Sequence, residues 1–244
     1  MTAGTPRVRM FAGPNGSGKS TLKGVIGPEL YGVYINADEI AQGLQQTGKF
    51  DLSAFGLKGL GVQLNQFLEI SDRLADLKSI GLLIGENSLS LPRESTSPYL
   101  AAVLAEFVRH ELLKARRSFT FETVMSHPSK VELLREAQSA GYRTYLYFVA
   151  TEDPDINCSR VENRVRKGGH SVPPDKTVSR YYRSLDLLWD AIQVSNRAFV
   201  FDNSSDNVEK SWLAEITDGE TLEYKSDTIP QWFKRYVLDK ATDS

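Results

Sequence analysis

The sequence predicts an α/β fold in which a mostly parallel central sheet is flanked by helices. Three observations lead to this prediction. Short apolar segments alternate with longer segments of helical periodicity along most of the chain, which is the pattern of a parallel sheet covered on both faces. A glycine-rich turn follows the first apolar segment. The 244 residues include 41% hydrophobic residues, enough for a globular chain of this length to bury a core without disulfides.

The predicted strands are the five apolar segments at residues 8–12, 33–36, 118–122, 142–150 and 198–201. Helical patterns cover residues 101–116, 129–140 and 154–167, and a further helix is expected at residues 21–26, directly after the glycine-rich turn. In such sheets, ligands bind beyond the carboxyl ends of the strands. The polar residues that follow each strand are therefore the candidates for a functional site.

Residues 45–98 interrupt the alternation of strands and helices. Residues 63–78 have helical spacing, whereas residues 81–98 are loop-like and contain Ser, Pro and Gly. We interpret the segment as an inserted helical segment between the second strand and its crossover helix. Near the C-terminus, Asp218-Gly219 lies between two short strand-like segments and predicts a hairpin at about residues 213–225. No repeat or long linker divides the chain, so we expect a single domain over residues 1–244.

The charge and composition exclude several classes of protein. A net charge of −2 argues against nucleic acid or a membrane surface as a partner, since such proteins usually carry a broad basic field. No apolar run approaches the roughly 20 residues that span a bilayer, and we expect a cytoplasmic protein. The three histidines lack metal-ligand spacing. The single cysteine, Cys158, fits a reducing compartment and is expected to be a small, unreactive residue.

The turn after the first strand reads GPNGSGKS from Gly13 to Ser20 and fits the P-loop pattern G-x-x-x-x-G-K-[ST] at every fixed position. Glycines leave the backbone unhindered, so that successive N–H groups form a nest for phosphate oxygens. Lys19 would reach the β- and γ-phosphates, and the Ser20 hydroxyl would ligate Mg²⁺. The following helix would add partial positive charge. The alternative is a glycine-rich turn that binds no nucleotide. The expected cofactor-binding residues are Gly13, Asn15, Gly16, Ser17, Gly18, Lys19, Ser20 and Thr21.

Carboxylates follow two further strands. Asp38 comes directly after the second strand, where an acid can face the γ-phosphate and accept a proton from an attacking hydroxyl. Alternatively, Asn36 or Asp38 caps the helix that begins at Glu39. Glu122 ends the third strand and resembles a Walker B acid that holds Mg²⁺ through water. Glu122 could instead accept hydrogen bonds from a hydroxylated substrate, or it could be a helix-start carboxylate.

A local basic segment lies between residues 160 and 183. Arg160 and Arg164 are four positions apart and share one helix face, as do Arg180 and Arg183, which are three apart. Residues 168–174 between them read GGHSVPP, a flexible pair followed by prolines, and His170 is expected to be a loop residue. Two basic helices joined by such a loop are typical of a lid over a triphosphate; the alternative is a solvated basic face.

The last predicted strand is followed by Asp202 and Asn203. In many P-loop kinases this position lies beside the nucleotide base, so Asn203 is a candidate contact for adenine. A turn or capping role is the alternative for both residues.

Several motifs together resemble the compact zeta-toxin-like P-loop kinases. They are FAGPNGSGKST at residues 11–21, INADEIA at 35–41, Phe121-Glu122-Thr123, the spaced Arg160-Val161 and Arg164-Val165, Gly168-Gly169-His170, Val172-Pro173 and RYYRSL at 180–185. They occur in the family's order over about residues 7–44 and 101–204. The resemblance implies a P-loop NTPase fold, ATP and Mg²⁺ as cofactors, and phosphorylation of the 3′-hydroxyl of UDP-N-acetylglucosamine. An antitoxin protein is the partner that such a toxin implies.

The resemblance also implies roles for individual residues. Asp38 would be the catalytic base, and Lys19 and Ser20 the phosphate and magnesium contacts. Glu122 and Thr123 would contact the substrate. Arg164 and Arg180 would be the lid arginines, although Arg160 or Arg183 could replace either.

The sequence thus predicts a phosphotransferase that moves the γ-phosphoryl group of ATP to a small-molecule hydroxyl. Because the insertion at 45–98 falls where the family builds its substrate pocket, another sugar, a nucleotide or an antibiotic is an alternative acceptor. A nucleotide-dependent switch that hydrolyses ATP slowly is an alternative of a different class. Phosphorylation of nucleic-acid ends fits poorly, since the chain lacks an aromatic and basic stripe.

Overall fold

In this computed structural model, residues 4–70, 81–169, 171–205 and 210–242 are described. Contacts divide the chain into two units, the first made of Met1–Tyr31 with Phe121–Ser244 and the second of Gly32–Thr120. The expectation of a single domain over residues 1–244 stays a prediction.

The first unit is built on a sheet with the strand order β10-β9-β8-β7-β1-β6. The bounds are β1 (Arg7–Ala12), β6 (Phe119–Thr123), β7 (Arg143–Ala150), β8 (Arg197–Asp202), β9 (Ser211–Thr217) and β10 (Thr221–Tyr224). Strand β7 pairs in parallel with β1 and with β8, whereas β9 runs antiparallel to both β8 and β10. The predicted α/β fold with a mostly parallel central sheet is confirmed.

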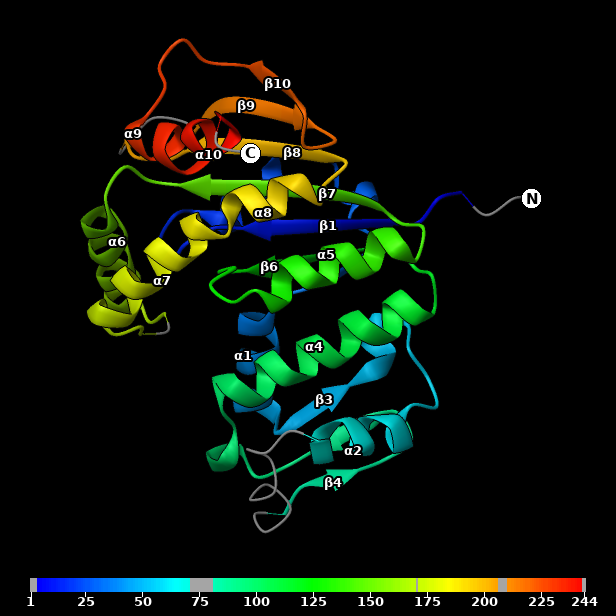
Figure 1. The fold of residues 1–244 in the computed structure, drawn as a ribbon. Helices are drawn as coiled ribbons and strands as arrows, with labels where there is room; N and C mark the ends of the chain where they lie inside the picture. The colour runs from blue at the N-terminus through cyan, green and yellow to red at the C-terminus, as the bar shows by residue number, and fades with distance from the viewer. Residues whose placement is uncertain (1–3, 71–80, 170, 206–209, 243–244) are drawn as a thin grey trace. The chain divides into compact units, whose positions relative to one another are not determined.

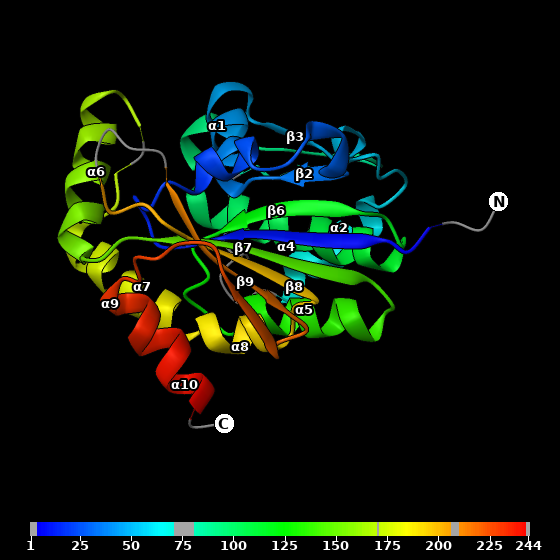
Figure 2. The same ribbon diagram turned by 90° about the horizontal axis from the view of Figure 1, so that it is seen from above.

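Helices cover this sheet and extend beyond one end of it. The α-helices of the first unit are α5 (Ser129–Ser139), α6 (Pro154–Arg166), α7 (Pro174–Asp186), α8 (Leu188–Gln193), α9 (Gln231–Phe233) and α10 (Asp239–Thr242), with the π-helix η5 (Lys234–Leu238) between the last two. Helices α5 and α8 lie over one face of the sheet, and α6 and α7 lie beyond the end toward which β1 and β7 run (Figure 1, Figure 2). The central strands β1 and β7 carry fully buried side chains such as Phe11 and Phe148.

The segment after the glycine-rich turn differs from the prediction. Residues Lys19–Gly24 form a short 3-10 helix, η1, followed by a second one, η2 (Pro28–Leu30). The expected helix at 21–26 was therefore wrong in type and extent. The physical reason is local: Gly24 and then Gly27-Pro28 are residues that an α-helix disfavours. A six-residue 3-10 helix supplies little of the helix dipole that the sequence had led us to expect.

The second unit contains strand β2 (Val33–Ile35), which neighbours the first residues of β6, and a separate sheet with the order β3-β5-β4. Its other elements are α1 (Ala37–Thr47), β3 (Lys49–Asp51), η3 (Leu52–Phe55), α2 (Gly61–Ile70), β4 (Leu83–Ile84), β5 (Ser88–Ser90), η4 (Arg93–Ser95) and α4 (Pro98–Lys114). The insertion at 45–98 is partly helical, as expected, and the loop-like residues 81–98 also contain the short strands β4 and β5, which were not predicted. The predicted helix at 63–78 is present to Ile70, and its remainder lies outside the described residues.

The C-terminal hairpin expected at about residues 213–225 is present as β9 and β10. Asp218 and Gly219 have φ of 51° and 71°, the left-handed conformation that a tight hairpin turn requires. None of the helices within the described ranges is long and apolar enough to span a membrane.

Candidate functional site

The carboxyl ends of three parallel strands bring separate segments of the first unit together. In the register of the sheet, Ala12 of β1 pairs with Phe148 of β7, and Ala150 of β7 pairs with Asp202 of β8. The P-loop follows β1, Thr151 follows β7, and Asn203 follows β8. The polar residues expected at this edge therefore come from distant parts of the sequence.

The P-loop adopts a conformation that its glycines alone permit. Gly13, Gly16 and Gly18 have φ of 144°, 77° and 96°, in the region that residues with a Cβ rarely occupy. All three are also approached closely by neighbours, and a Cβ on Gly13 would lie 2.1 Å from the backbone oxygen of Val149. A Cβ on Gly16 would lie 2.5 Å from the backbone oxygen of Asn157, and one on Gly18 would lie 2.4 Å from Nδ2 of Asn203. The loop is therefore packed against its surroundings as well as turned on itself.

Two asparagine amides hold the loop from outside. Nδ2 of Asn157, on α6, donates a hydrogen bond to the carbonyl oxygen of Asn15 at 2.5 Å. Nδ2 of Asn203 donates to the carbonyl oxygen of Ser17 at 2.8 Å. Asn203 thus supports the loop, as the alternative of a local structural role allowed, and its contact with adenine stays a prediction.

The loop contains polar atoms that a phosphate would suit. Within the described residues, the buried Oγ of Ser17 and Oδ1 of Asn15 have no hydrogen-bond partner, although more than about 90% of buried polar groups in proteins are paired. Nζ of Lys19 donates to the carbonyl oxygen of Pro14 at 2.8 Å, across the loop. Ser20 is exposed at the loop's end. An ammonium, a hydroxyl and a turned glycine-rich backbone are the donor set that a nucleotide phosphate requires.

A second lysine, which the sequence analysis missed, contacts the end of the loop. Nζ of Lys210 lies 3.0 Å from the carbonyl oxygen of Thr21 and 3.3 Å from its hydroxyl, and that hydroxyl donates to the carbonyl of Gly18 at 2.7 Å. Lys210 is 189 positions from Thr21 in the chain, so no local pattern could have found it. A cation is thereby held beside a residue expected to bind nucleotide.

The four candidate lid arginines have different environments. Arg160, on α6, donates to the carbonyl oxygen of Asn203 at 2.6 Å and so belongs to the support of the P-loop. Arg183, on α7, bonds within its own helix to the carbonyl of Ser179 at 3.4 Å. Arg164 is exposed on α6, and Arg180 is half-buried on α7. The roles of Arg164 and Arg180 as lid arginines stay predictions, and His170 lies outside the described residues.

The turn after β6 is hydrogen-bonded to α7. Oγ1 of Thr123 accepts a hydrogen bond from the backbone N–H of Met125 at 3.0 Å, and Met125 has a φ of 54°. Oγ of Ser184, on α7, donates to the carbonyl of Val124 at 2.8 Å. Thr123 therefore shapes the turn after β6, beside the half-buried Glu122.

Asp38 belongs to the second unit, where it lies in the first turn of α1. Asn36 is the N-cap of this helix, since its Oδ1 accepts hydrogen bonds from the backbone N–H of Asp38 at 2.8 Å and of Glu39 at 3.4 Å. The capping role that the sequence left open between Asn36 and Asp38 thus falls to Asn36. The carboxylate of Asp38 is exposed and is not needed as the cap.

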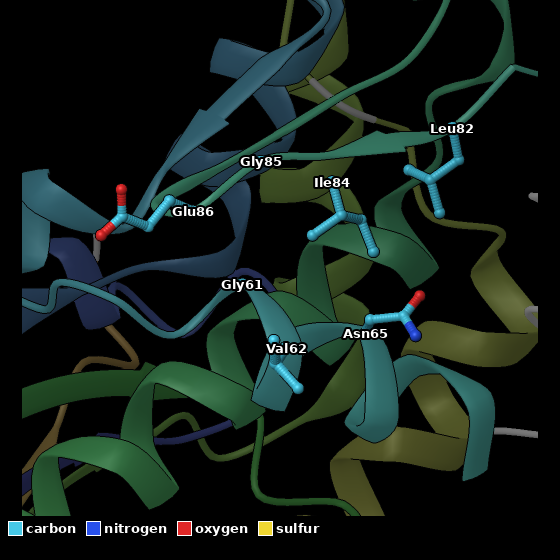
Figure 3. Close-up of a pocket in the computed structure, with 7 residues that line it drawn as sticks. All are labelled: Gly61, Val62, Asn65, Leu82, Ile84, Gly85 and Glu86. Atoms are coloured by element: carbon cyan, nitrogen blue, oxygen red, sulfur yellow. The ribbon is translucent and has the colours of Figure 1, made fainter.

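Two pockets lie within the second unit, and neither is lined by a predicted site residue. The smaller one, about 220 Å³, is lined on α1 by Asn36, Glu39, Ile40 and Gly43. At 100° per residue, Asp38 points to the opposite face of that helix. The larger one, about 800 Å³, lies between α2 and β4; Ile84 and Leu82 point toward α2, while Glu86 is directed away (Figure 3). This larger pocket is lined mostly by apolar groups and offers few side chains that could bind phosphate.

Cys158 is a half-buried free thiol on α6. Burial, with Asp155 and Asp153 nearby, raises the pKa of the Cys158 thiol, so the unreactive thiol has little thiolate character at neutral pH. Within the described ranges, no group of three His, Cys, Asp or Glu side chains could hold a metal ion.

Comparison with known proteins agrees with the motifs. Residues 95–209 match the model of the zeta toxin family. An uncharacterized protein of Haemophilus influenzae is 24% identical over 172 residues, which are 70% of this chain and 89% of that protein. The structure of the AvrRxo1-ORF1:AvrRxo1-ORF2 complex with sulphate ions is similar with a TM-score of 0.54 and 13% identity over 95% of this chain. The same complex with ATP gives a TM-score of 0.53, also at 13% identity, over 98% of this chain.

These likenesses differ in what they cover. This chain spans 63% of the AvrRxo1 chain with sulphate and 64% of the one with ATP, and identities of 13% show a shared fold. The family match begins at residue 95, so it includes β6, α6, α7 and β8 but not the P-loop or Asp38. Residues 95–209 are thus similar to the zeta toxin family, and they belong to an α/β fold with a mostly parallel central sheet.

Proposed function

We propose that this chain is an ATP- and Mg²⁺-dependent phosphotransferase that moves the γ-phosphoryl group to a hydroxyl of a small molecule. The observation that carries the proposal is the P-loop itself. Its buried Ser17 hydroxyl lacks a partner among the described residues, its ammonium spans the loop, and its glycines have positive φ. The family match and the fold shared with a complex solved with ATP support the same reaction class.

The residues of the first unit would bind and neutralise the phosphates. Lys19 would leave the carbonyl of Pro14 for the β- and γ-phosphate oxygens, and Ser20 would hold Mg²⁺. Mg²⁺ held there would help to neutralise the negative charge that develops on the phosphates. Arg164 and Arg180 would add positive charge from the lid, where an arginine on the transferring group contributes about 10³–10⁵ in rate.

The acceptor would be activated by a carboxylate. Asp38 would accept the proton of the acceptor hydroxyl as its oxygen bonds to phosphorus and ADP departs. Glu122 and Thr123 would contact the acceptor. The resemblance favours UDP-N-acetylglucosamine as acceptor and an antitoxin protein as partner, and the matched AvrRxo1 structures are two-component complexes. A cytoplasmic location stays a prediction.

The test is acceptor-dependent product formation. Purified protein is incubated with Mg-ATP and UDP-N-acetylglucosamine, and products are identified by mass spectrometry. We expect a sugar species one phosphate heavier and an equal amount of ADP. Asp38→Asn should abolish transfer and leave ATP affinity nearly intact, whereas Glu39→Gln, one position along the same exposed helix turn, should keep activity.

Other results would redirect the proposal. ADP formation without a phosphorylated sugar, restored to equal amounts by another hydroxyl compound, would correct the acceptor alone. ADP formation that no acceptor stimulates would refute the kinase and favour the switch. Full activity of Asp38→Asn would show that Asp38 is not the base.

A further inference from the structure

The P-loop is attached to asparagine side chains outside the motif at two carbonyls, those of Asn15 and Ser17. The carbonyl oxygen of Asn15 accepts from Nδ2 of Asn157 at 2.5 Å, and the carbonyl oxygen of Ser17 accepts from Nδ2 of Asn203 at 2.8 Å. In a trans peptide the C=O and the N–H point in opposite directions. Holding these two carbonyls from outside therefore turns the N–H groups of Gly16 and Gly18 toward the other side of the loop.

The side chain of Asn157 is itself held in place. It is fully buried, and its Oδ1 accepts a hydrogen bond from the hydroxyl of Thr151. The carbonyl of Asn15 assigns the amide orientation, because a carbonyl only accepts and so requires the nitrogen, while the Thr151 hydroxyl can donate to the oxygen. Thr151 is anchored in turn, since its carbonyl accepts from the hydroxyl of Tyr181 on α7 at 2.6 Å.

Helix α6 also contacts the loop through its backbone. The carbonyl oxygen of Asn157 would lie 2.5 Å from a Cβ on Gly16, so the two backbones pack without room for a side chain. One turn along the helix, Arg160 donates to the carbonyl of Asn203 at 2.6 Å. Helix α6 therefore connects the two asparagines, because it carries Asn157 and its Arg160 bonds to Asn203. The same helix carries Arg164, and its first turns pack against the P-loop.

We propose that Asn157 and Asn203 are positioning residues that clamp the P-loop carbonyls and so orient its N–H groups for the phosphates of a nucleotide. The inference rests on the proposed function, since it assumes that the loop binds phosphate. Neither side chain needs to touch the nucleotide. Because Asn157 lies on α6 and bonds to the loop, a shift of this helix would also change the orientation of the loop.

Asn157→Asp tests the clamp with almost no change of shape. It replaces the donating amide nitrogen by an oxygen that faces the carbonyl of Asn15. Asn163→Asp is the matched control, because Asn163 is exposed on the same helix and the change of charge is identical. Affinities for Mg-ATP and for inorganic tripolyphosphate are measured by calorimetry, and melting temperatures are recorded alongside.

We expect Asn157→Asp to weaken both affinities by about tenfold or more, the effect of leaving one buried polar group unpaired, while Asn163→Asp matches the wild type. Thr151→Val, which frees Oδ1 of Asn157 without changing the donor, should give a smaller loss and serves if Asn157→Asp does not fold. A lower melting temperature with unchanged affinities would overturn the clamp and leave a purely structural role. Failure of the wild type to bind either ligand would instead overturn the proposed function, and the clamp with it.

Discussion

Gly16→Ala is the substitution whose effect the structure defines most sharply. Gly16 has a φ of 77°, and a residue with a Cβ in the left-handed region costs about 1–2 kcal/mol. The new Cβ would also lie 2.5 Å from the backbone oxygen of Asn157, about 0.9 Å inside the usual contact limit of 3.4 Å. Because that oxygen belongs to the helix backbone of α6, it cannot rotate away as a side chain would.

The overlap has to be relieved by a shift of the loop or of α6. Overpacking of this kind costs typically 1–3 kcal/mol. With the backbone term, the expected loss is about 2–5 kcal/mol of folding free energy. For a chain of this size each kcal/mol lowers the melting temperature by about 2–4 °C, so calorimetry should show a decrease of roughly 4–20 °C.

Gly43→Ala is the control. Gly43 lies inside α1, and a Cβ there would meet nothing within 4 Å, so the substitution should stabilise the helix by up to about 1 kcal/mol. The two variants add the same methyl group and are expected to change stability in opposite directions. Equal melting temperatures for Gly16→Ala and the wild type would refute the close approach of the P-loop to α6.

Two further predictions concern contacts around the same loop. Burial raises the pKa of the Tyr181 hydroxyl. The stability that this neutral hydroxyl contributes is therefore fully present below its usual pKa of about 10 and is lost as the pH rises above that value. Tyr181→Phe should reduce this loss of stability at alkaline pH in urea titrations, and an unchanged loss would contradict the prediction. Lys210→Ala removes a cation bound to Thr21 and should weaken ATP binding several-fold in calorimetry. Lys240→Ala, which loses a similar backbone contact at Asp186, should leave the affinity for ATP unchanged. Equal affinities of Lys210→Ala and the wild type would show that Lys210 has only a structural role.

The parts of the fold that the sequence predicted correctly have local causes. The five predicted strands are short, largely apolar segments bounded by polar turns, and β1 and β7 end in buried apolar runs at residues 10–12 and 146–150. The short strands β4 and β5 were missed because two or three residues, among them Ser88 and Ser90, carry no detectable alternation. They form a sheet because β5 pairs with both β3 and β4, which is a tertiary effect.

The site divides in the same way between local and distant residues. The P-loop pattern identified the turn, its lysine and its serine, because those residues are adjacent in sequence. Asn157 and Asn203 are 142 and 186 positions from the carbonyls they bind. One sequence signal was available for Asn157: it shares the buried stripe of α6 with Val161, where an unpaired amide would be costly and so implies a specific partner.

This difference has a physical origin in what a glycine-rich motif can specify. Glycines mark the positions where a side chain would not fit. Because they lack a Cβ, they also make the backbone of the loop more flexible. A loop with glycines but no supporting contacts would lose conformational entropy each time it bound a phosphate. The bonds from Asn157 and Asn203 to the loop carbonyls would meet that cost during folding instead. Substitutions at these two asparagines should therefore resemble substitutions within the motif in their effect on phosphate affinity, although neither residue belongs to it.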